Sequence, residues 1–487
     1  MTKKNRRIIF YIFLVLFAIL ACAIILYAQG YKLDWQSKSL TSAGAFYFKS
    51  QPKGASIYIN EKLRGTTNKF IRRLLPDKYN IEVSKTGYYI WQKTLKITSK
   101  MVTEAKNILL IKKDIKLNTL VTPNDVQKIF ISPDKKKLIY LTNSTPKINP
   151  EFQKVADPRE ISYSGPNLQL LEISKDEQQI YPISISKDAG FTSQLPSLET
   201  IKEIAWSNNS YNFILLFSNG YYYNFNLENE PKLINLTDLI RSLSNYQIYT
   251  FDNFQFHPNN TNKIYFRSKN NLYYIKIDYS QPLQSVISGP IIYDILNYTI
   301  LDNKILYVKD LEGGLYETNL DVSSFKKLFD IPFIYPNCKI KILSPQIIIV
   351  DNTLYFFNDQ IQSLEKITDS IKGFQFTEDN KKFLWNTDKE IGVIWLEPEL
   401  EQPQKNKFDR EIIIKTLENI SQALWYPGTT QHIIFIIENN IKITELDSRD
   451  KRNTFTIISA EKPNVFFSEI KNKLFILSQK NLFDIEI

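Results

Sequence analysis

The stretch QKIFISPDKKKLIYL, residues 127–141, contains two apolar runs separated by a polar turn. The runs, 128–131 and 138–141, are rich in β-branched and aromatic residues, which favour strands. Between them, Pro133 presets φ for the second position of a turn, and Asp134 tolerates the third. The stretch therefore predicts a β-hairpin.

Similar hairpins recur through the rest of the chain at intervals of roughly 33–50 residues, apart from a longer first interval that contains an insertion. Each unit begins with an apolar strand that ends in a turn, continues with a strongly apolar strand, and often adds two more. Four-stranded units at this period are typical of a β-propeller. The eight predicted units start at 128–134, 203–208, 254–259, 298–302, 341–345, 374–379, 423–428 and 465–468.

Eight blades are favoured, with seven as the alternative if the short fifth unit merges with a neighbour. The last unit stops after three strands, at Ile487. The strand-like segment 115–121 is predicted to supply its missing outer strand, because ring closure removes exposed sheet edges. Two insertions, 143–166 and 397–408, are predicted to open on opposite faces of the ring. Such loops often carry function, and drift under loose selection is the other explanation.

The turn Ser132-Pro133-Asp134-Lys135 resembles that of the WD40-like repeats in TolB-type propellers. The match is good in the first unit and degenerate in later ones, and the Trp-Asp ending of true WD40 strands does not occur in the sequence. The resemblance implies an all-β propeller over residues 114–487.

Residues 43–113 form a second region of short alternating strands. Ile57 and Ile59 share one face of a predicted strand, and Tyr79, Ile81 and Val83 share one face of another. About six or seven such strands in roughly 70 residues predict a compact β-sandwich.

Three turns in this region resemble those of the PEGA domain. They are Pro52-Lys53-Gly54-Ala55, Leu75-Pro76-Asp77-Lys78-Tyr79 and Lys85-Thr86-Gly87-Tyr88. The departures are Lys53, where the family name has Glu, and Asp77-Lys78, where Gly is usual. The resemblance implies a β-sandwich common in envelope and surface proteins, and it implies no catalytic residues.

Residues 8–28 read IIFYIFLVLFAILACAIILYA and carry no charge. As a helix they span about 31 Å, close to the hydrocarbon core of a bilayer. Basic residues at 3, 4, 6 and 7 precede them, so the positive-inside bias predicts a cytoplasmic tail over 1–7 and an extracytoplasmic chain after a polar spacer at 29–42. A signal peptide cleaved near 21–23 is the alternative, although the apolar run continues beyond that site.

Charge is concentrated in the predicted sandwich. Residues 43–113 hold 15 Lys and Arg against 4 Asp and Glu, a net charge of +11, whereas 114–487 hold 40 against 46, a net charge of −6. A basic domain beside a membrane attracts anionic lipid headgroups or phosphate-bearing wall polymers, at about 1 kcal/mol per basic residue. A merely solvated polar face is the other interpretation, and nucleic acid is not expected outside the cell. The predicted polyanion-binding residues are Lys53, Lys62, Arg64, Lys69, Arg72, Arg73 and Lys78.

The amino-acid composition argues against several classes of functional site. The chain has two His, two Cys and 14 Gly among 487 residues, which argues against a zinc site, a disulfide framework and glycine-rich phosphate loops. None of the phosphate-loop, hydrolase or metalloprotease motifs sought occurs in the sequence, so we expect no cofactor, metal or catalytic residues. The sequence favours a non-catalytic envelope scaffold, anchored by a single membrane pass, whose propeller binds a protein or glycan. The alternative is a propeller enzyme acting on surface glycans.

Overall fold

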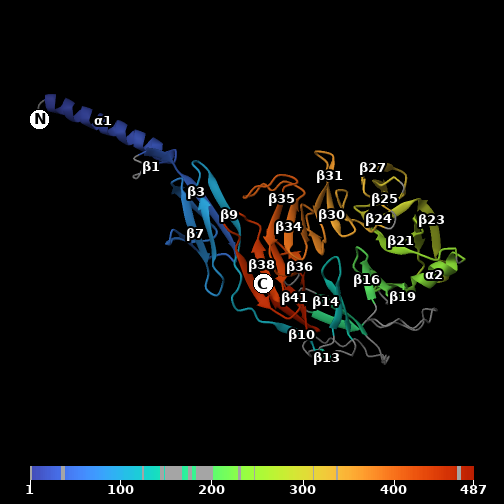
Figure 1. The fold of residues 1–487 in the computed structure, drawn as a ribbon. Helices are drawn as coiled ribbons and strands as arrows, with labels where there is room; N and C mark the ends of the chain where they lie inside the picture. The colour runs from blue at the N-terminus through green and yellow to red at the C-terminus, as the bar shows by residue number, and fades with distance from the viewer. Residues whose placement is uncertain are drawn as a thin grey trace.

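A computed structural model describes residues 3–486, apart from 35–38, 123–125, 143–146, 149–166, 174–177, 183–200, 229–231, 246, 311, 336–337 and 469–472. The chain passes from a long helix through a small sandwich into a ring of blades (Figure 1). Helix α1 (Lys3–Ala28) contains the apolar segment Asn5–Ala28, with a mean hydropathy of 3.2 and no buried residues in its most apolar window. It is long and apolar enough to cross a membrane, a test that a signal sequence also meets.

A β-hairpin follows the helix, where the sequence analysis expected only a polar spacer. Strands β1 (Tyr31–Asp34) and β2 (Ser39–Ser42) pair antiparallel. Gly30 ends the helix with φ +84°, a left-handed conformation that glycine adopts without strain. The Gly30 carbonyl then accepts a hydrogen bond from the Ala43 amide at 2.9 Å, which ties the helix end to the start of the sandwich.

Seven strands form the sandwich, in two sheets with the orders β6-β3-β9 and β5-β4-β7-β8. Strands β3 and β9 pair parallel, and the other pairs are antiparallel. Strands β5 and β6 lie at one edge of the two sheets, and β8 and β9 lie at the other. The strands are β3 (Gly44–Gln51), β4 (Ser56–Ile59), β5 (Lys62–Thr66), β6 (Lys69–Leu74), β7 (Lys78–Ser84), β8 (Trp91–Lys96) and β9 (Val102–Leu109).

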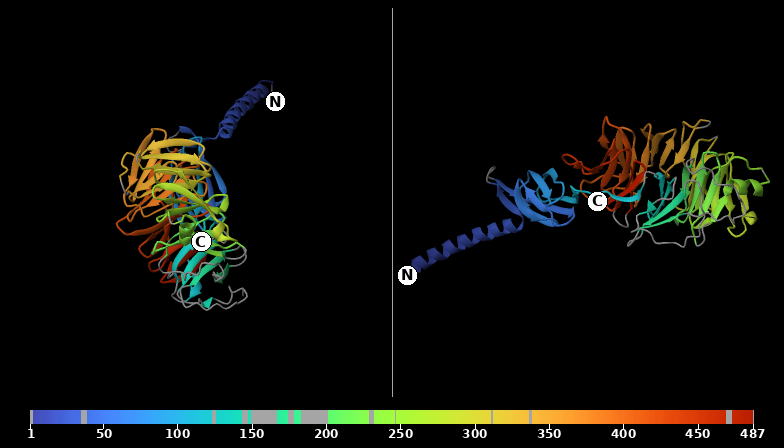
Figure 2. Two further views of the ribbon diagram at one scale, coloured as in Figure 1. Left: turned by 90° about the vertical axis from the view of Figure 1, so that its right-hand side faces the viewer. Right: turned by 90° about the horizontal axis from the view of Figure 1, so that it is seen from below.

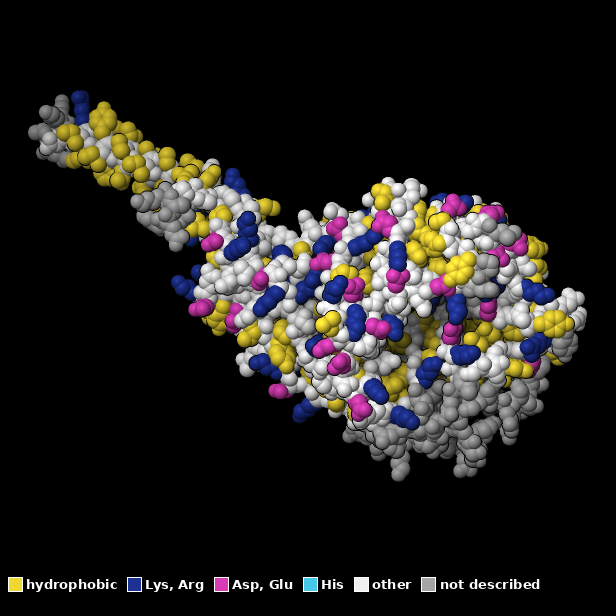
Figure 3. Space-filling model, viewed as in Figure 1, with side chains coloured by type: hydrophobic (Ala, Val, Ile, Leu, Met, Phe, Trp, Pro, Cys, Tyr) yellow, Lys and Arg dark blue, Asp and Glu magenta, His cyan; other side chains and the backbone are white. Residues whose placement is uncertain are grey.

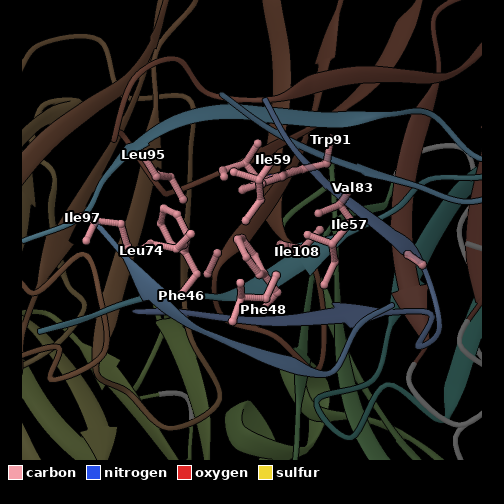
Figure 4. Packing of buried hydrophobic residues seen from close by; sticks show 14 of the residues in the cluster. Phe46, Phe48, Ile57, Ile59, Leu74, Val83, Trp91, Leu95, Ile97 and Ile108 are labelled. Atoms are coloured by element: carbon pink, nitrogen blue, oxygen red, sulfur yellow. The ribbon is translucent and has the colours of Figure 1, made fainter. Parts of the chain in front are cut away.

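The two sheets enclose an apolar core (Figure 4). Phe46 and Phe48 of β3 come from one sheet, the paired Ile57 of β4 and Val83 of β7 come from the other, and all four side chains are fully buried. They occupy alternate strand positions, as the period-2 pattern of the sequence requires. The alternation therefore sets which face of each strand is buried.

The described residues of the ring form eight blades, which agrees with the favoured count rather than with seven. Seven blades have four strands each, and the last has five. Their innermost strands are β11 (Val126–Ile131), β16 (Ile201–Trp206), β20 (Asp252–His257), β24 (Ile295–Leu301), β28 (Ile340–Ile342), β32 (Gly373–Phe376), β36 (Ile420–Trp425) and β40 (Asn464–Ser468). The second strands are β12 (Lys137–Thr142), β17 (Asn212–Phe217), β21 (Asn260–Ser268), β25 (Lys304–Lys309), β29 (Ile347–Val350), β33 (Lys382–Asn386), β37 (His432–Ile437) and β41 (Lys473–Ser478).

The outer half of each blade completes the ring (Figure 2). A short helix, α2 (Leu236–Leu243), follows the second blade, and a 3-10 turn, η3 (Pro282–Gln284), precedes the last strand of the third. The third strands are β14 (Asn167–Ile173), β18 (Tyr222–Asn226), β22 (Asn271–Lys276), β26 (Gly314–Asn319), β30 (Thr353–Asn358), β34 (Glu390–Trp395), β38 (Asn440–Glu445) and β42 (Asn481–Glu486). The outermost strands of the first seven blades are β15 (Gln178–Pro182), β19 (Lys232–Asn235), β23 (Val286–Ile292), β27 (Phe325–Asp330), β31 (Ser363–Thr368), β35 (Arg410–Lys415) and β39 (Thr454–Ser459).

The last blade is closed by a strand that precedes the first blade in sequence, as predicted. Strand β10 (Asn118–Thr122) pairs antiparallel with β42, with Asn118 opposite Asp484 and Thr119 opposite Phe483. A fifth strand, β13 (Lys147–Ile148), pairs with β10 and comes from the first insertion. The rest of that insertion, 143–146 and 149–166, lies outside the described residues.

Local hydrogen bonds explain the turn that marks the blades. The Ser132 hydroxyl accepts a hydrogen bond from the Lys137 amide at 2.9 Å, and Asp134 accepts one from the Lys136 amide at 3.1 Å. Lys135 takes a positive φ of 55°. Any residue pair with a short acceptor in these two places can make the turn. Later blades use Ser207 with Asn209, and Thr377 with Asp379, as the two acceptors, which explains why the motif degenerates without loss of the hairpin.

Candidate functional site: the basic sandwich and its junction with the ring

The seven predicted polyanion-binding residues are all exposed. Five of them lie on β5 and β6, the edge strands that face away from the ring. Lys53 lies in the turn between β3 and β4, and Lys78 begins β7. The structure thus gathers most of the predicted set on one edge of the sandwich, which we call the basic edge. Its members are Lys62, Arg64, Lys69, Arg72 and Arg73.

Strand register divides the predicted residues between two ends of the sandwich. Lys69 is opposite Phe48, far from the helix, whereas Leu74 at the other end of β6 is opposite Gly44, close to where α1 joins. Arg72 and Arg73 are therefore near the helix. The Arg73 guanidinium carbon lies 3.4 Å from the centre of the Tyr27 ring, on the last turn of α1.

The opposite edge of the sandwich docks on the ring through a buried ion pair. The Lys93 ammonium of β8 lies 3.0 Å from Glu445 of β38, and the two side chains are 0% and 5% exposed. The same ammonium donates to the carbonyls of Asp447, Arg449 and Lys451 at 2.8, 2.9 and 2.5 Å. The loop between β38 and β39 therefore encloses the Lys93 ammonium with its main-chain oxygens.

Glu445 has further partners that hold it in place. The Trp91 indole donates to it at 2.9 Å, and the Asn453 amide donates at 2.7 Å. Burial raises the pKa of the Glu445 carboxyl, and Lys93 and these hydrogen bonds oppose that rise. Because the charges compensate each other inside the protein, removal of either partner leaves a buried charge unpaired.

The second predicted insertion, 397–408, lies at this junction. Gln402 accepts a hydrogen bond from the Glu104 amide of β9 at 3.0 Å and donates to the Val102 carbonyl at 3.0 Å. Lys106 of β9 pairs with Glu401 at 3.7 Å. The insertion therefore has a structural role, because it extends the docking surface of the sixth blade onto the sandwich.

Apolar contacts complete the junction. Leu109 and Ile111 leave the sandwich and pack in the hydrophobic cluster of the last two blades, with Ile443 and Ile457. Tyr89 stacks on Phe455, with ring centres 5.4 Å apart. The sandwich therefore lies beside the ring rather than across its opening, as Figures 1 and 2 show.

The sequence analysis missed the junction residues. The signal that was available is the alternation of Trp91, Lys93 and Leu95, which places a lysine on the buried face of β8. A lysine at such a position is buried only when it has a partner, but the partner Glu445 is distant in sequence. The alternation alone does not identify it.

Amide side chains on the innermost strands link neighbouring blades. Gln255 accepts from the Ile300 amide of the next blade at 2.8 Å, and Gln422 accepts from the Val465 amide at 2.9 Å. Gln375 accepts from the Trp425 amide at 2.8 Å in the same way. These polar residues therefore hold inner strands together.

The carboxylates that the eight described innermost strands contribute are Glu203 and Asp252, from adjacent blades. Arg267 holds Asp252 through two hydrogen bonds of 2.8 and 2.6 Å. Figure 3 shows the ring face, with a hollow near its middle and mixed charges around it. Within the described residues, no group of three or more His, Cys, Asp and Glu side chains has the arrangement of a metal site.

The geometry defines a protein with a helix, a small sandwich and an eight-bladed ring docked together. Residues 44–110, which form the sandwich, match the model of the PEGA domain, and the four-stranded sheets of the ring are the blades of a β-propeller. No curated protein matches the chain.

Several solved propellers resemble the ring at low sequence identity. The β-propeller domain of Cps50 (Swd1) from Myceliophteria thermophila is 8% identical, with a TM-score of 0.40, covering 77% of this chain and 100% of that one. The C-terminal WD40 domain of Sif2 is 11% identical, with a TM-score of 0.44, covering 76% and 97%. Sqt1 from Saccharomyces cerevisiae is 8% identical, with a TM-score of 0.41, covering 76% and 97%.

Proposed function

We propose that this chain is a membrane-anchored, extracytoplasmic binding protein of the cell envelope, without catalytic activity. Its propeller presents a platform to a protein or glycan, and its PEGA domain holds that platform near the membrane or wall. A PEGA domain joined to a propeller indicates a binding or scaffold role in general terms. The membrane topology and the partner are the finer parts of the proposal.

One observation carries the proposal most directly, namely the buried junction between the sandwich and the ring. The Lys93–Glu445 pair and its three carbonyl partners hold the ring against the domain that follows the helix. A propeller held at its side keeps its central opening free for a partner (Figure 1). This arrangement suits presentation of a surface.

The alternative, a propeller enzyme acting on surface glycans, would need a pair of carboxylates that both face the substrate. The innermost strands offer Glu203 and Asp252, and Asp252 is engaged by Arg267. Binding therefore has more support than glycan hydrolysis.

We propose that the basic edge, together with Lys78 at the start of β7, binds polyanions, and the test uses the full chain in neutral detergent on a polyphosphate column. Arg64→Glu, Arg72→Glu, Arg73→Glu and Lys78→Glu together should lower the eluting salt concentration severalfold. Exposed charges are screened beyond about 8 Å at physiological ionic strength, so retention should also fall steeply with salt. The matched control reverses four exposed lysines of the ring by the same total charge: Lys202→Glu, Lys269→Glu, Lys326→Glu and Lys462→Glu. Equal loss in both variants would mean that retention follows net charge and not this edge.

A further inference from the structure

The end of α1, the hairpin and the sandwich form one hydrogen-bonded unit. The Ala43 amide donates to the Gly30 carbonyl at 2.9 Å, and the Lys100 amide donates to the Ala43 carbonyl at 3.1 Å. Ser42 and Ser99 are joined by a side-chain hydrogen bond. The hairpin is therefore fixed at the level where the helix ends, beside the sandwich.

This level carries exposed aliphatic side chains. Leu33 and Leu40 lie directly opposite each other on β1 and β2, and they are 42% and 48% exposed. Met101, next to the hydrogen-bonded Lys100, is 57% exposed. A cross-strand pair of leucines has no hydrophobic stabilisation while it is exposed to water. Burial of the pair in the interfacial region of a bilayer is favourable.

Two cationic side chains lie at the same level as the end of α1. Arg73 lies over the Tyr27 ring, and the Lys100 ammonium lies 5.9 Å from the centre of the Tyr31 ring. Cation–π contacts of this kind orient a charge on an aromatic face. Arginine and lysine with tyrosine at a helix end are typical of a headgroup region.

Strand register brings other charges to this end of the sandwich. Within the sandwich, the residues near this end carry both signs, with six bases and two acids. The bases are Lys62, Arg72, Arg73, Lys78, Lys96 and Lys100, and the acids are Glu61 and Asp77. The balance is positive, which favours an anionic surface.

We propose that Leu33, Leu40, Arg73 and Lys100 form a membrane-seated surface that rests on the phosphate-bearing headgroups of the bilayer crossed by α1. The leucines enter the interface, and the two cations bind headgroup phosphates. This inference rests on the proposed membrane anchor. Because the buried junction fixes the ring to the sandwich, the membrane-seated surface also sets the orientation of the ring relative to the membrane.

The test labels single cysteines of the full chain with an environment-sensitive fluorophore in lipid vesicles that contain brominated lipids. The sites are the native Cys22 of α1, Leu40→Cys, and Ile361→Cys as the control; all three variants carry Cys338→Ala, and the latter two also carry Cys22→Ser. Ile361 is 63% exposed on the fifth blade. We expect at least twofold stronger quenching at positions 22 and 40 than at position 361.

The three sites separate the two proposals. Quenching at position 22 without quenching at position 40 would overturn the proposal of a membrane-seated surface and would leave the proposed membrane anchor intact. A lack of quenching at position 22 would overturn the proposed membrane anchor and, with it, the proposal of a membrane-seated surface.

A second comparison tests the cations. In vesicles with 30% phosphatidylglycerol, Arg73→Gln with Lys100→Gln should reduce quenching at position 40 at least twofold, to the level seen with phosphatidylcholine alone. The matched control is Lys53→Gln with Lys69→Gln, at the other end of the sandwich. An equal reduction in the control, or no reduction in either, would overturn the proposed role of Arg73 and Lys100.

Discussion

The buried ammonium of Lys93 needs compensation, because an isolated charge is strongly disfavoured in the protein interior. Glu445 supplies the opposite charge, and three carbonyls of the β38–β39 loop accept hydrogen bonds from the Lys93 ammonium. The alternation in β8 indicates that Lys93 is inward, but its partner arises only when the ring has formed. The exposed lysines need no tertiary partner, so the density of charge in the sequence predicts them, whereas the role of Lys93 depends on a contact with the ring.

Replacement of Lys93 should therefore destabilise the docked state. We expect Lys93→Ala to cost about 3–5 kcal/mol, because Glu445 is left buried and unpaired. The matched control is Lys96→Ala on the same strand, an exposed position that should change stability by less than about 0.5 kcal/mol. Thermal unfolding and limited proteolysis of the full chain measure both. Equal behaviour of the two variants would contradict the role assigned to this ion pair.

His432 begins β37 and is 4% exposed, next to Thr429, whose hydroxyl lies 3.1 Å from Nδ1. Burial lowers its pKa to about 3, from an ordinary value near 6.5. Below pH 6.5 the unfolded chain therefore binds a proton that the folded chain does not, and the free energy of unfolding decreases as the pH is lowered. The loss should reach about 2 kcal/mol at pH 5.

Denaturant titrations at pH 7.5 and pH 5 check this dependence. His432→Gln should remove about that share of the loss, whereas His257→Gln, at a half-buried site with a smaller shift of the same sign, should remove less. An unchanged pH dependence in His432→Gln would show that this histidine is not the source.

At the scale of elements, the sequence predicted the propeller and its closure well. The repeating Ser-Pro-Asp-type turn has a local cause in the bonds around Ser132, so it can be recognised without tertiary information. Ring closure by β10 follows from counting strands. The hairpin β1–β2 and strand β13 were not predicted, because both are short and lack the apolar alternation that marks strands.

Closure by β10 can be tested with one side chain. Leu120 is 4% exposed and packs with Phe475 and Leu482 of the last blade. Leu120→Ala should destabilise the ring by about 2–5 kcal/mol, and hydrogen exchange of β42 should quicken. The control is Leu117→Ala, at a position that is 39% exposed. If Leu120→Ala behaves like Leu117→Ala in both measurements, β10 does not close the ring in solution.

At the scale of the whole molecule, charge and anchor are combined at one end. The helix leads directly into the domain that holds a net charge of +11, and the ring that follows 114 onward has a net charge of −6. An anionic membrane surface attracts the positively charged sandwich and repels the negatively charged ring. The space-filling view agrees with this division only in part, because both signs alternate over the ring face (Figure 3).

The central claim is that α1 remains in the membrane with the sandwich and ring on its outer side. A membrane-impermeant maleimide, applied to intact spheroplasts, tests it with Ile361→Cys and Asn5→Cys, each in a background that lacks both native cysteines (Cys22→Ser, Cys338→Ala). We predict that Ile361→Cys is labelled in intact spheroplasts, that Asn5→Cys is labelled only after lysis, and that both label one species of 57.1 kDa. Labelling in the reverse order, or loss of position 5 from the labelled species, would contradict it.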